Sequence, residues 1–253
     1  MLTQAIWWTT NLLEAILLGR AAWRKFIKVY PLFYTYLAYV LLESLARFYV
    51  YVWQPPLYTN FYWGTQGVSV LLGFAVVWEI FRKALARYPG AFRMVRASFV
   101  VIVVVVTAKI LANVLAGESW SLAATIAEEE RDFRVVQAFL LLAVVGLVSF
   151  YRIQIGRNLR GMMLGYGFFI GTSVLNLTFR SYFGDGFQIW WQYLQPAAYV
   201  LVLLVWCVTL WPYQPNPEPG AESRIEQDYQ ALVNATRHRF RQVRAHVGRT
   251  VRS

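Results

Sequence analysis

The sequence predicts an all-α integral membrane protein, a polytopic bundle of about seven transmembrane helices. Hydrophobic residues make up 58% of the 253 residues and charged residues only 15%, and the mean hydropathy is +0.43. Soluble domains are nearer to half apolar and a quarter charged. The apolar residues also lie in blocks of about 20, the length of helix that crosses the hydrocarbon of a bilayer.

Short polar or basic segments separate these blocks and place the expected helices. The expected helices span 2–22, 31–53, 61–81, 97–117, 133–151, 162–180 and 193–211. Prolines fall at the expected helix ends, where a missing N–H group does least harm. Residues 1–211 are therefore the expected transmembrane domain.

Two further segments follow this domain. Residues 212–220 form a proline-rich spacer. Residues 221–253 carry apolar side chains at mostly three- and four-residue intervals and many arginines, which predicts a basic amphipathic helix. Such a helix is expected to lie on the anionic inner leaflet. The alternatives are docking to a protein partner and self-association.

The distribution of cations predicts the orientation. Of the 24 Lys and Arg residues, 19 lie in one alternating set of segments, 20–28, 82–96, 152–160 and 221–253. The other set contains Arg131, Arg134 and Arg180, together with acidic residues at 128–132. The positive-inside rule places the first set in the cytoplasm and the N-terminus outside, which requires an odd number of crossings. We therefore expect a multi-pass protein of a plasma or bacterial inner membrane, with lipid rather than nucleic acid as the partner of its cations.

The residues that most membrane enzymes need are missing from the expected helices. The two histidines, His238 and His246, lie in the tail, which excludes a haem or zinc site built from histidines in the membrane. We therefore expect no catalytic residues, no metal site and no cofactor. Glu43 beside a cation is the one weak indication of an enzyme.

Four ionisable residues fall deep in the expected helices: Glu14, Glu43, Arg47 and Lys109. Each costs at least about 2.5–3.5 kcal/mol at the bilayer centre, and their formal charges sum to zero, which favours mutual pairing. Glu43 and Arg47 are four residues apart on one helix and share a face. We therefore predict one network of Glu43, Arg47 and Lys109. Glu79 lies beside two cations near a helix end, which predicts a surface ion pair there.

Uncharged polar residues extend this pattern in the half of each helix away from the basic segments. The candidate ligand-binding residues are Glu14, Glu43, Arg47, Gln66, Lys109, Asn113, Asn176, Gln195 and Tyr199. Polar side chains in a membrane turn toward one another rather than toward lipid. They predict an outward-facing polar cavity above an apolar inner half, or a set of hydrogen bonds that only holds the helices together.

Two glycine pairs in the sixth expected helix also carry a prediction. Gly161 and Gly165, and then Gly167 and Gly171, are each separated by three residues. This spacing predicts close packing of the sixth helix inside the bundle, with a dimer face as the alternative.

These features favour an integral membrane sensor, similar in plan to a receptor, or a structural subunit of a membrane complex. An outer cavity, a coupled bundle and a basic cytoplasmic tail suit this role, and the short tail requires a separate protein partner or a homo-oligomer for output. The alternative is a small-molecule or lipid transporter, which needs polar groups along the whole path. An intramembrane enzyme is a further, less favoured alternative.

Overall fold

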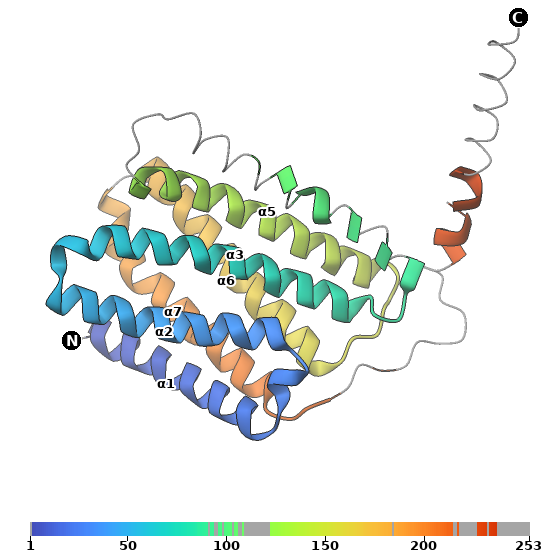
Figure 1. Cartoon of the computed structure of the whole chain (residues 1–253), viewed down its shortest axis with the longest axis horizontal. Coiled ribbons are helices and arrows are strands. Elements are labelled where there is room, and N and C mark those ends of the chain that lie inside the picture. The colour runs from blue at the N-terminus through green and yellow to red at the C-terminus, as the bar shows by residue number, and fades with distance from the viewer. Residues whose placement is uncertain are drawn as a thin grey trace, which may run out of the picture.

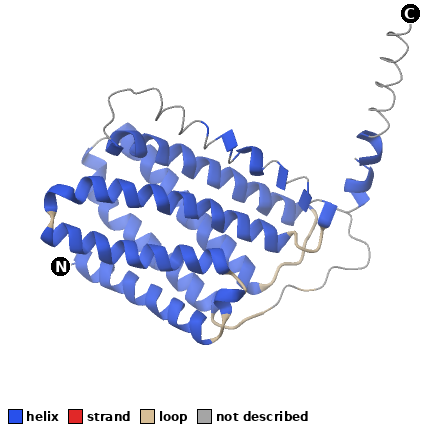
Figure 2. Cartoon of the chain, viewed as in Figure 1, coloured by secondary structure: helices blue, strands red, loops and turns tan. Residues whose placement is uncertain are grey.

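The computed structural model describes most of the chain. The described residues are 2–90, 92–93, 96–97, 99–102, 104–105, 108, 122–183, 185–214, 217, 227–231 and 233–236. All regular elements within them are helices (Figure 2). In chain order they are α1 (Leu2–Trp23), the 3₁₀ turn η1 (Phe26–Lys28), α2 (Pro31–Trp53), the 3₁₀ turn η2 (Pro55–Leu57), α3 (Tyr58–Ala84), α5 (Leu122–Phe150), α6 (Arg157–Phe183) and α7 (Asp185–Leu210).

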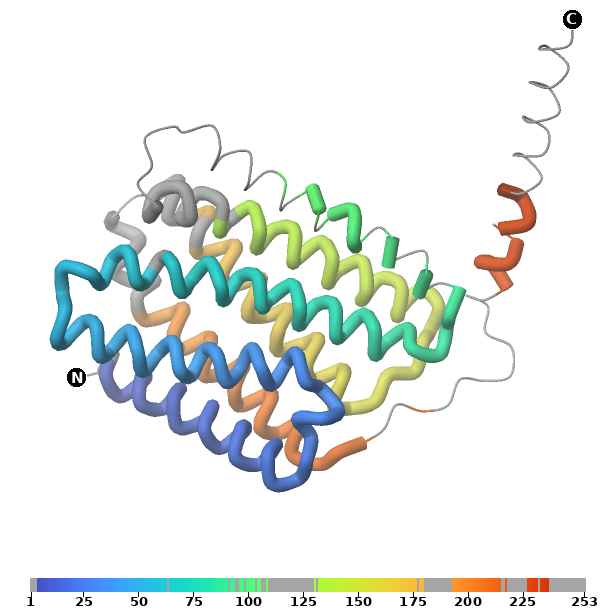
Figure 3. The backbone as a smooth tube through the Cα atoms, viewed as in Figure 1, coloured from blue at the N-terminus to red at the C-terminus, as the bar shows by residue number. Residues whose placement is uncertain are grey.

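The long helices lie side by side and form a closed ring (Figure 1). Around this ring α1 contacts α2, α2 contacts α3, α3 contacts α5, α5 contacts α6, α6 contacts α7, and α7 returns to α1. The helix α3 also contacts α6 across the ring. The path of the chain (Figure 3) shows α1, α3, α5 and α7 running in one direction and α2 and α6 in the other.

The surface of this bundle suits a membrane. Among the described residues, three helical stretches are long and apolar enough to cross a bilayer: Pro55–Ala84, Asp132–Phe150 and Tyr193–Leu210. Large apolar side chains also face outward, and Leu42, Phe139 and Leu142 are each more than 60% exposed. Apolar exposure on this scale marks a surface that meets lipid or another protein.

The positions of the helices follow the apolar blocks closely, with one correction. The expected helix at 31–53 coincides with α2, and α1, α3 and α6 contain the helices expected for their blocks, whereas α7 covers the expected 193–211 except for its last residue. The fifth helix was expected to begin at 133, whereas α5 begins at Leu122. The expectation of a loop immediately before 133 was therefore wrong. The fourth expected helix, 97–117, lies mostly outside the described residues, and its described positions are helical.

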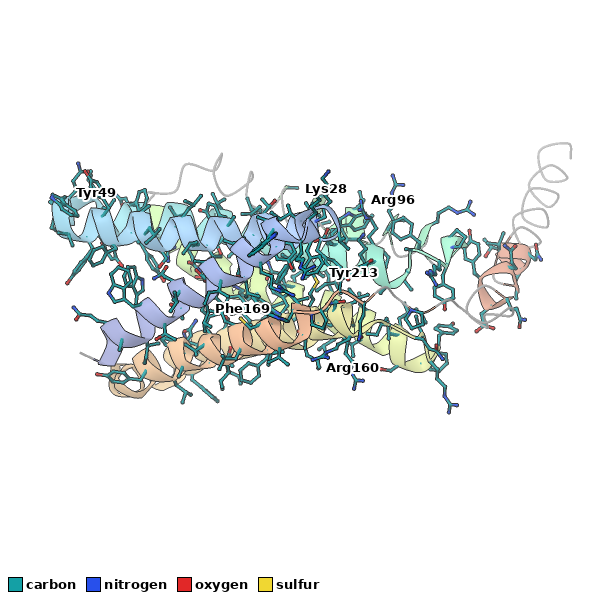
Figure 4. The ribbon with its side chains drawn as sticks, turned by 90° about the horizontal axis from the view of Figure 1, so that it is seen from below. Lys28, Tyr49, Arg96, Arg160, Phe169 and Tyr213 are labelled. Carbon is teal, nitrogen blue, oxygen red and sulfur yellow. The ribbon has the colours of Figure 1, made fainter. Side chains whose placement is uncertain are left out.

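Cationic side chains collect at one end of the bundle, which we call the basic end. It comprises the C-terminal ends of α1, α3, α5 and α7 and the N-terminal ends of α2 and α6. Figure 4 shows Lys28, Arg96 and Arg160 toward this end, with Tyr213, whereas Tyr49 lies at the opposite end.

The half of the bundle nearer the basic end has an apolar core. Phe33 of α2, Trp206 of α7 and Leu159 of α6 are fully buried there. The rings of Phe33 and Trp206 meet edge to face, with centroids 4.8 Å apart. This packing fits the prediction that this half of the helices is apolar.

Small residues let α6 approach α7 closely. A Cβ atom added at Gly165 would overlap the indole of Trp206, and one at Gly161 would overlap the side chain of Thr209. The predicted close packing inside the bundle is therefore confirmed for this glycine pair. Gly171 meets nothing within 4 Å.

Candidate functional site

A chain of charged and polar side chains links α2, α3 and α5 in the half of the bundle away from the basic end. Arg47 of α2 forms an ion pair with Glu43, one turn earlier on the same helix. The same guanidinium group donates to Thr65 Oγ1 and to Gln66 Oε1 of α3, each at 3.0 Å. Its Cζ atom lies 4.1 Å from the centroid of the Tyr62 ring. Arg47 thus joins α2 to α3 by charge, hydrogen bonds and a cation–π contact.

Gln66 carries the chain onward to α5. Its amide nitrogen donates to Glu130 Oε1, and this carboxylate lies 3.6 Å from Nε of Arg134. Arg134 is only 2% exposed and Glu130 only 8%. We refer to Glu43, Arg47, Gln66, Glu130 and Arg134 as the charge network. Its formal charges sum to zero, as buried ionic groups require.

At Arg134, and deeper in the bundle at Gln137 and Tyr166, several buried polar atoms have no hydrogen-bond partner. They are Arg134 Nε and Nη1, Gln137 Oε1 and the Tyr166 hydroxyl. The other end of the Gln137 amide donates to the carbonyl oxygen of Val70 at 2.7 Å. A Cβ atom at Gly73 would overlap both Tyr166 and Gln137, so glycine leaves the space that these side chains occupy. Unsatisfied groups of this kind are uncommon in folded proteins and often mark functional positions.

Two other polar pairs join α7 to α1 and to α6. Tyr199 of α7 donates a hydrogen bond of 2.6 Å to Glu14 Oε1 of α1, whose side chain is 1% exposed. Asn176 of α6 donates to Gln195 Oε1 of α7. Glu14 lies within electrostatic range of Glu43, which places the α1–α7 pair beside the charge network.

The structure therefore sorts the predicted site residues into groups. It brings Glu43, Arg47 and Gln66 together. It also pairs Glu14 with Tyr199 and Asn176 with Gln195. The predicted pairing of Glu43 with Arg47 is confirmed. Lys109 and Asn113 lie outside the described residues, so the participation of Lys109 stays a prediction.

Sequence reasoning missed Glu130 and Arg134 as site residues: Glu130 was assigned to the segment before the fifth expected helix, and Arg134, near the start of that helix, was counted only among the outer charges. A signal was present, because Glu130, Arg134 and Gln137 are spaced by four and three residues and so share one face of a helix. This face continues directly into the apolar block of the fifth helix. Reading the helix backward from that block would have placed both charges inside the bundle.

Glu79 also differs from its prediction. It does not form a surface ion pair but is 1% exposed, and its Oε2 atom accepts a hydrogen bond of 2.8 Å from the backbone N–H of Phe33. Pro31 begins α2, so Phe33 lies in the first turn, where N–H groups have no partner within the helix. Glu79 of α3 thus caps α2 and complements its dipole.

At the basic end, hydrogen bonds hold the segment that follows α7. We call residues 211–214 and 217 the post-α7 segment. Arg20 of α1 donates to the carbonyl oxygen of Trp211 at 2.8 Å, and Asn158 of α6 donates to that of Pro212 at 2.7 Å. Asn158 Oδ1 also accepts from the backbone N–H of Gln214 at 2.6 Å. The segment between the bundle and the tail is therefore attached to α1 and α6.

Two pockets flank the post-α7 segment at the basic end. The first has a volume of about 190 Å³ and lies between the α1–α2 turn, the end of α3 and the α5–α6 turn. The second, of about 380 Å³, is lined by Arg20 and Arg24. Tyr213 lines both pockets. The outward-facing cavity predicted at the opposite end stays a prediction.

The chemistry that these side chains support is electrostatic. No group of three or more His, Cys, Asp or Glu side chains within the described ranges could hold a metal ion. Outside the helices, burial of the Tyr30 side chain, strengthened by neighbouring Tyr213, Tyr34 and Glu79, raises the pKa of its hydroxyl. Tyr30, which lines the first pocket, is therefore a neutral hydrogen-bond donor at physiological pH.

The fold and these groups define a class of protein: an all-helical chain with helices apolar enough to span a membrane and charged groups buried between them. Comparison of the chain with protein-family models, with curated proteins and with solved structures finds no match.

Proposed function

We propose that the chain crosses a plasma or bacterial inner membrane seven times, with its N-terminus outside and the basic end in the cytoplasm. The directions of the described helices, with α1, α3, α5 and α7 one way and α2 and α6 the other, and the collection of cations at one end support this topology. The domain limits remain 1–211 for the membrane domain, 212–220 for the spacer and 221–253 for the tail helix.

Cysteine labelling of intact cells tests the topology. In a Cys207→Ala background, a cysteine at position 119 should react with a membrane-impermeant reagent, and one at position 253 should react only after the cells are opened. Labelling of position 253 in intact cells would reverse the orientation.

We further propose that the protein is a sensor or a structural subunit of a membrane complex, with the charge network as its responsive element. The observation that carries this proposal is Arg134, a nearly fully buried cation that has unpartnered N–H groups and one carboxylate at 3.6 Å. Such a group is sensitive to any ligand, ion or partner that offers it an acceptor. The apolar core between the charge network and the basic end suits conformational coupling better than passage of a polar solute.

A sensor requires that a change in the charge network alters the post-α7 segment at the basic end, and this coupling can be tested. Glu130→Gln alters the charge network, and amide exchange of Gln214 reports on the post-α7 segment at the basic end. A sensor predicts faster exchange at Gln214 in this variant, with Lys28→Gln, an exposed change at the basic end itself, as the control. Unchanged exchange in Glu130→Gln would favour a purely structural role for the network.

A transporter is the second candidate, favoured by a specific observation. The unpartnered atoms of Gln137 and Tyr166 extend the line of polar groups from Arg134 deeper into the bundle. α7 also contains Pro196, which removes one backbone hydrogen bond inside the helix. Proton or anion flux into proteoliposomes that the Tyr166→Phe variant abolishes would favour transport over sensing.

The tail supplies the proposed link to the inner leaflet or to a protein partner. Its described positions, 227–231 and 233–236, are helical. Each arginine near an anionic surface contributes about 1 kcal/mol, so a peptide of residues 221–253 should bind anionic vesicles and weaken as salt is added. Equal binding to neutral vesicles would point to a protein partner or self-association instead.

A further inference from the structure

The first pocket at the basic end combines a defined cavity with a one-sided set of charges. It is lined by Lys83 and Arg87 near the end of α3, with the side chains of Tyr30, Tyr88 and Gln154 among its other polar groups. No carboxylate is among the described residues that line it. Glu79, one turn before Lys83 on α3, accepts from the N–H of Phe33 at the start of α2 and lies within electrostatic range of Lys83. The pocket is therefore a site of positive potential with several neutral donors.

The two cations are held in place by neighbouring groups. Arg87 Nη1 donates to the carbonyl oxygen of Pro217 at 2.6 Å, which fixes the guanidinium beside the post-α7 segment. That bond uses one of the five N–H groups of a guanidinium. The Lys83 ammonium lies 5.7 Å from the centroid of the buried Tyr30 ring. Neither cation has to be ordered from solution when an anion enters, which lowers the entropic cost of binding.

The shape and composition of the pocket indicate the chemical class of the ligand. Tetrahedral phosphate oxygens accept several N–H and O–H donors at once, which this set of arginine, lysine and tyrosine groups offers. The remaining wall is apolar and includes Val29, Ala84 and Ile153. A basic pocket between membrane helices at the cytoplasmic surface is the kind of site that holds a lipid headgroup.

We propose that this pocket binds a phosphate group through Lys83 and Arg87, with the hydroxyls of Tyr30 and Tyr213 as further donors. The phosphate belongs either to the headgroup of an anionic lipid or to a free anion. This site is separate from the tail and from the charge network, and it does not depend on the sensor role. Arg87 contacts the post-α7 segment, and Tyr213 belongs to it. The ligand would therefore hold that segment against the end of α3.

Native mass spectrometry of the full-length protein in detergent tests the proposal. The protein is titrated with phosphatidylglycerol, with phosphatidylcholine and with inorganic phosphate. Phosphatidylglycerol should bind more tightly than phosphatidylcholine, and Lys83→Ala and Arg87→Ala should each weaken it about fivefold, as expected for about 1 kcal/mol per cation. The matched control is Arg160→Ala, an exposed cation of the same end that lines neither pocket, which should leave binding unchanged.

A second variant removes the cavity without changing the charge. Ala86 lines the pocket and is exposed, so Ala86→Phe should fill the space without disturbing the core, and it should also weaken binding. Displacement of the lipid by millimolar inorganic phosphate would assign the site to a free anion, and its absence would assign the site to the headgroup. Equal losses in Arg160→Ala and Arg87→Ala, or no binding of either probe, would overturn the proposal.

Discussion

Glu79 of α3 accepts a hydrogen bond of 2.8 Å from the backbone N–H of Phe33 and so caps the first turn of α2 from a neighbouring helix. In the proposed membrane topology this contact has a larger consequence than a cap in water. No solvent is available in hydrocarbon to satisfy an N–H group that loses its partner. The contact therefore fixes both the starting point of α2 and its position against α3.

Replacing Glu79 by alanine should destabilise the bundle by about 1–3 kcal/mol, because the N–H of Phe33 would then be buried without an acceptor. Glu79→Gln keeps one acceptor oxygen and should cost less. Thermal unfolding in detergent measures both. Arg160→Ala, an exposed change at the same end of the bundle, serves as the control and should have almost no effect. Equal midpoints for the glutamine and alanine variants would show that the hydrogen bond contributes little.

Two tyrosines between the helices should respond in opposite ways to loss of their hydroxyl groups: Tyr199, which is partly buried, and Tyr166, which is fully buried. Tyr199→Phe removes the donor to Glu14 and leaves a buried carboxyl group without it, which should cost about 1–3 kcal/mol. Tyr166→Phe removes a hydroxyl that has no partner and should be neutral or stabilising. The pair controls itself, since both changes delete one oxygen from a tyrosine ring in the same bundle. A larger loss in Tyr166→Phe, measured by thermal unfolding, would reveal a partner of that hydroxyl.

The sequence was sufficient to place most helices because the signal was strong and local. Apolar blocks near 20 residues in length coincide with α2, fall within α1, α3 and α6, and match α7 except for one residue at its end. The start of α5 could not be found in this way, because the charged residues at 128–132 separate its first turns from the apolar block. Glu130 is buried where Gln66 of α3 donates a hydrogen bond to it, and this contact is a property of the packed bundle.

The candidate site shows the same division between local and distant information. Glu43 and Arg47 share a helix face, so their pairing could be predicted from spacing alone. The bond between Tyr199 and Glu14 joins residues 185 positions apart and depends on α7 closing the ring against α1. Glu79 was misassigned for a related reason: its partner is a backbone group on another helix, and only its cationic neighbours are visible in the sequence.

The contact between α6 and α7 predicts a contrast between two glycines of one helix. Gly165→Ala would place a methyl group against the indole of Trp206 and should destabilise the protein by about 1–3 kcal/mol. Gly171→Ala, six residues later where nothing lies within 4 Å, should be neutral or stabilise by about 0.5–1 kcal/mol. Unfolding midpoints in detergent measure both changes. Combining Gly165→Ala with Trp206→Phe should recover part of the loss, whereas equal effects at 165 and 171 would argue against close packing at this glycine.

The charge network predicts that removing one partner of a buried ion pair lowers the stability of the protein more than neutralising both partners. Arg134→Met leaves the carboxylate of Glu130 buried without its cation and should destabilise the bundle by about 3 kcal/mol. Adding Glu130→Gln neutralises that carboxylate, so the double variant should be more stable than Arg134→Met alone, even though it carries one substitution more. The thermal double-mutant cycle measures this coupling, with Arg160→Met at the exposed basic end as the control for loss of an arginine. Additive effects at positions 130 and 134 would show that the 3.6 Å contact does not couple the two charges energetically.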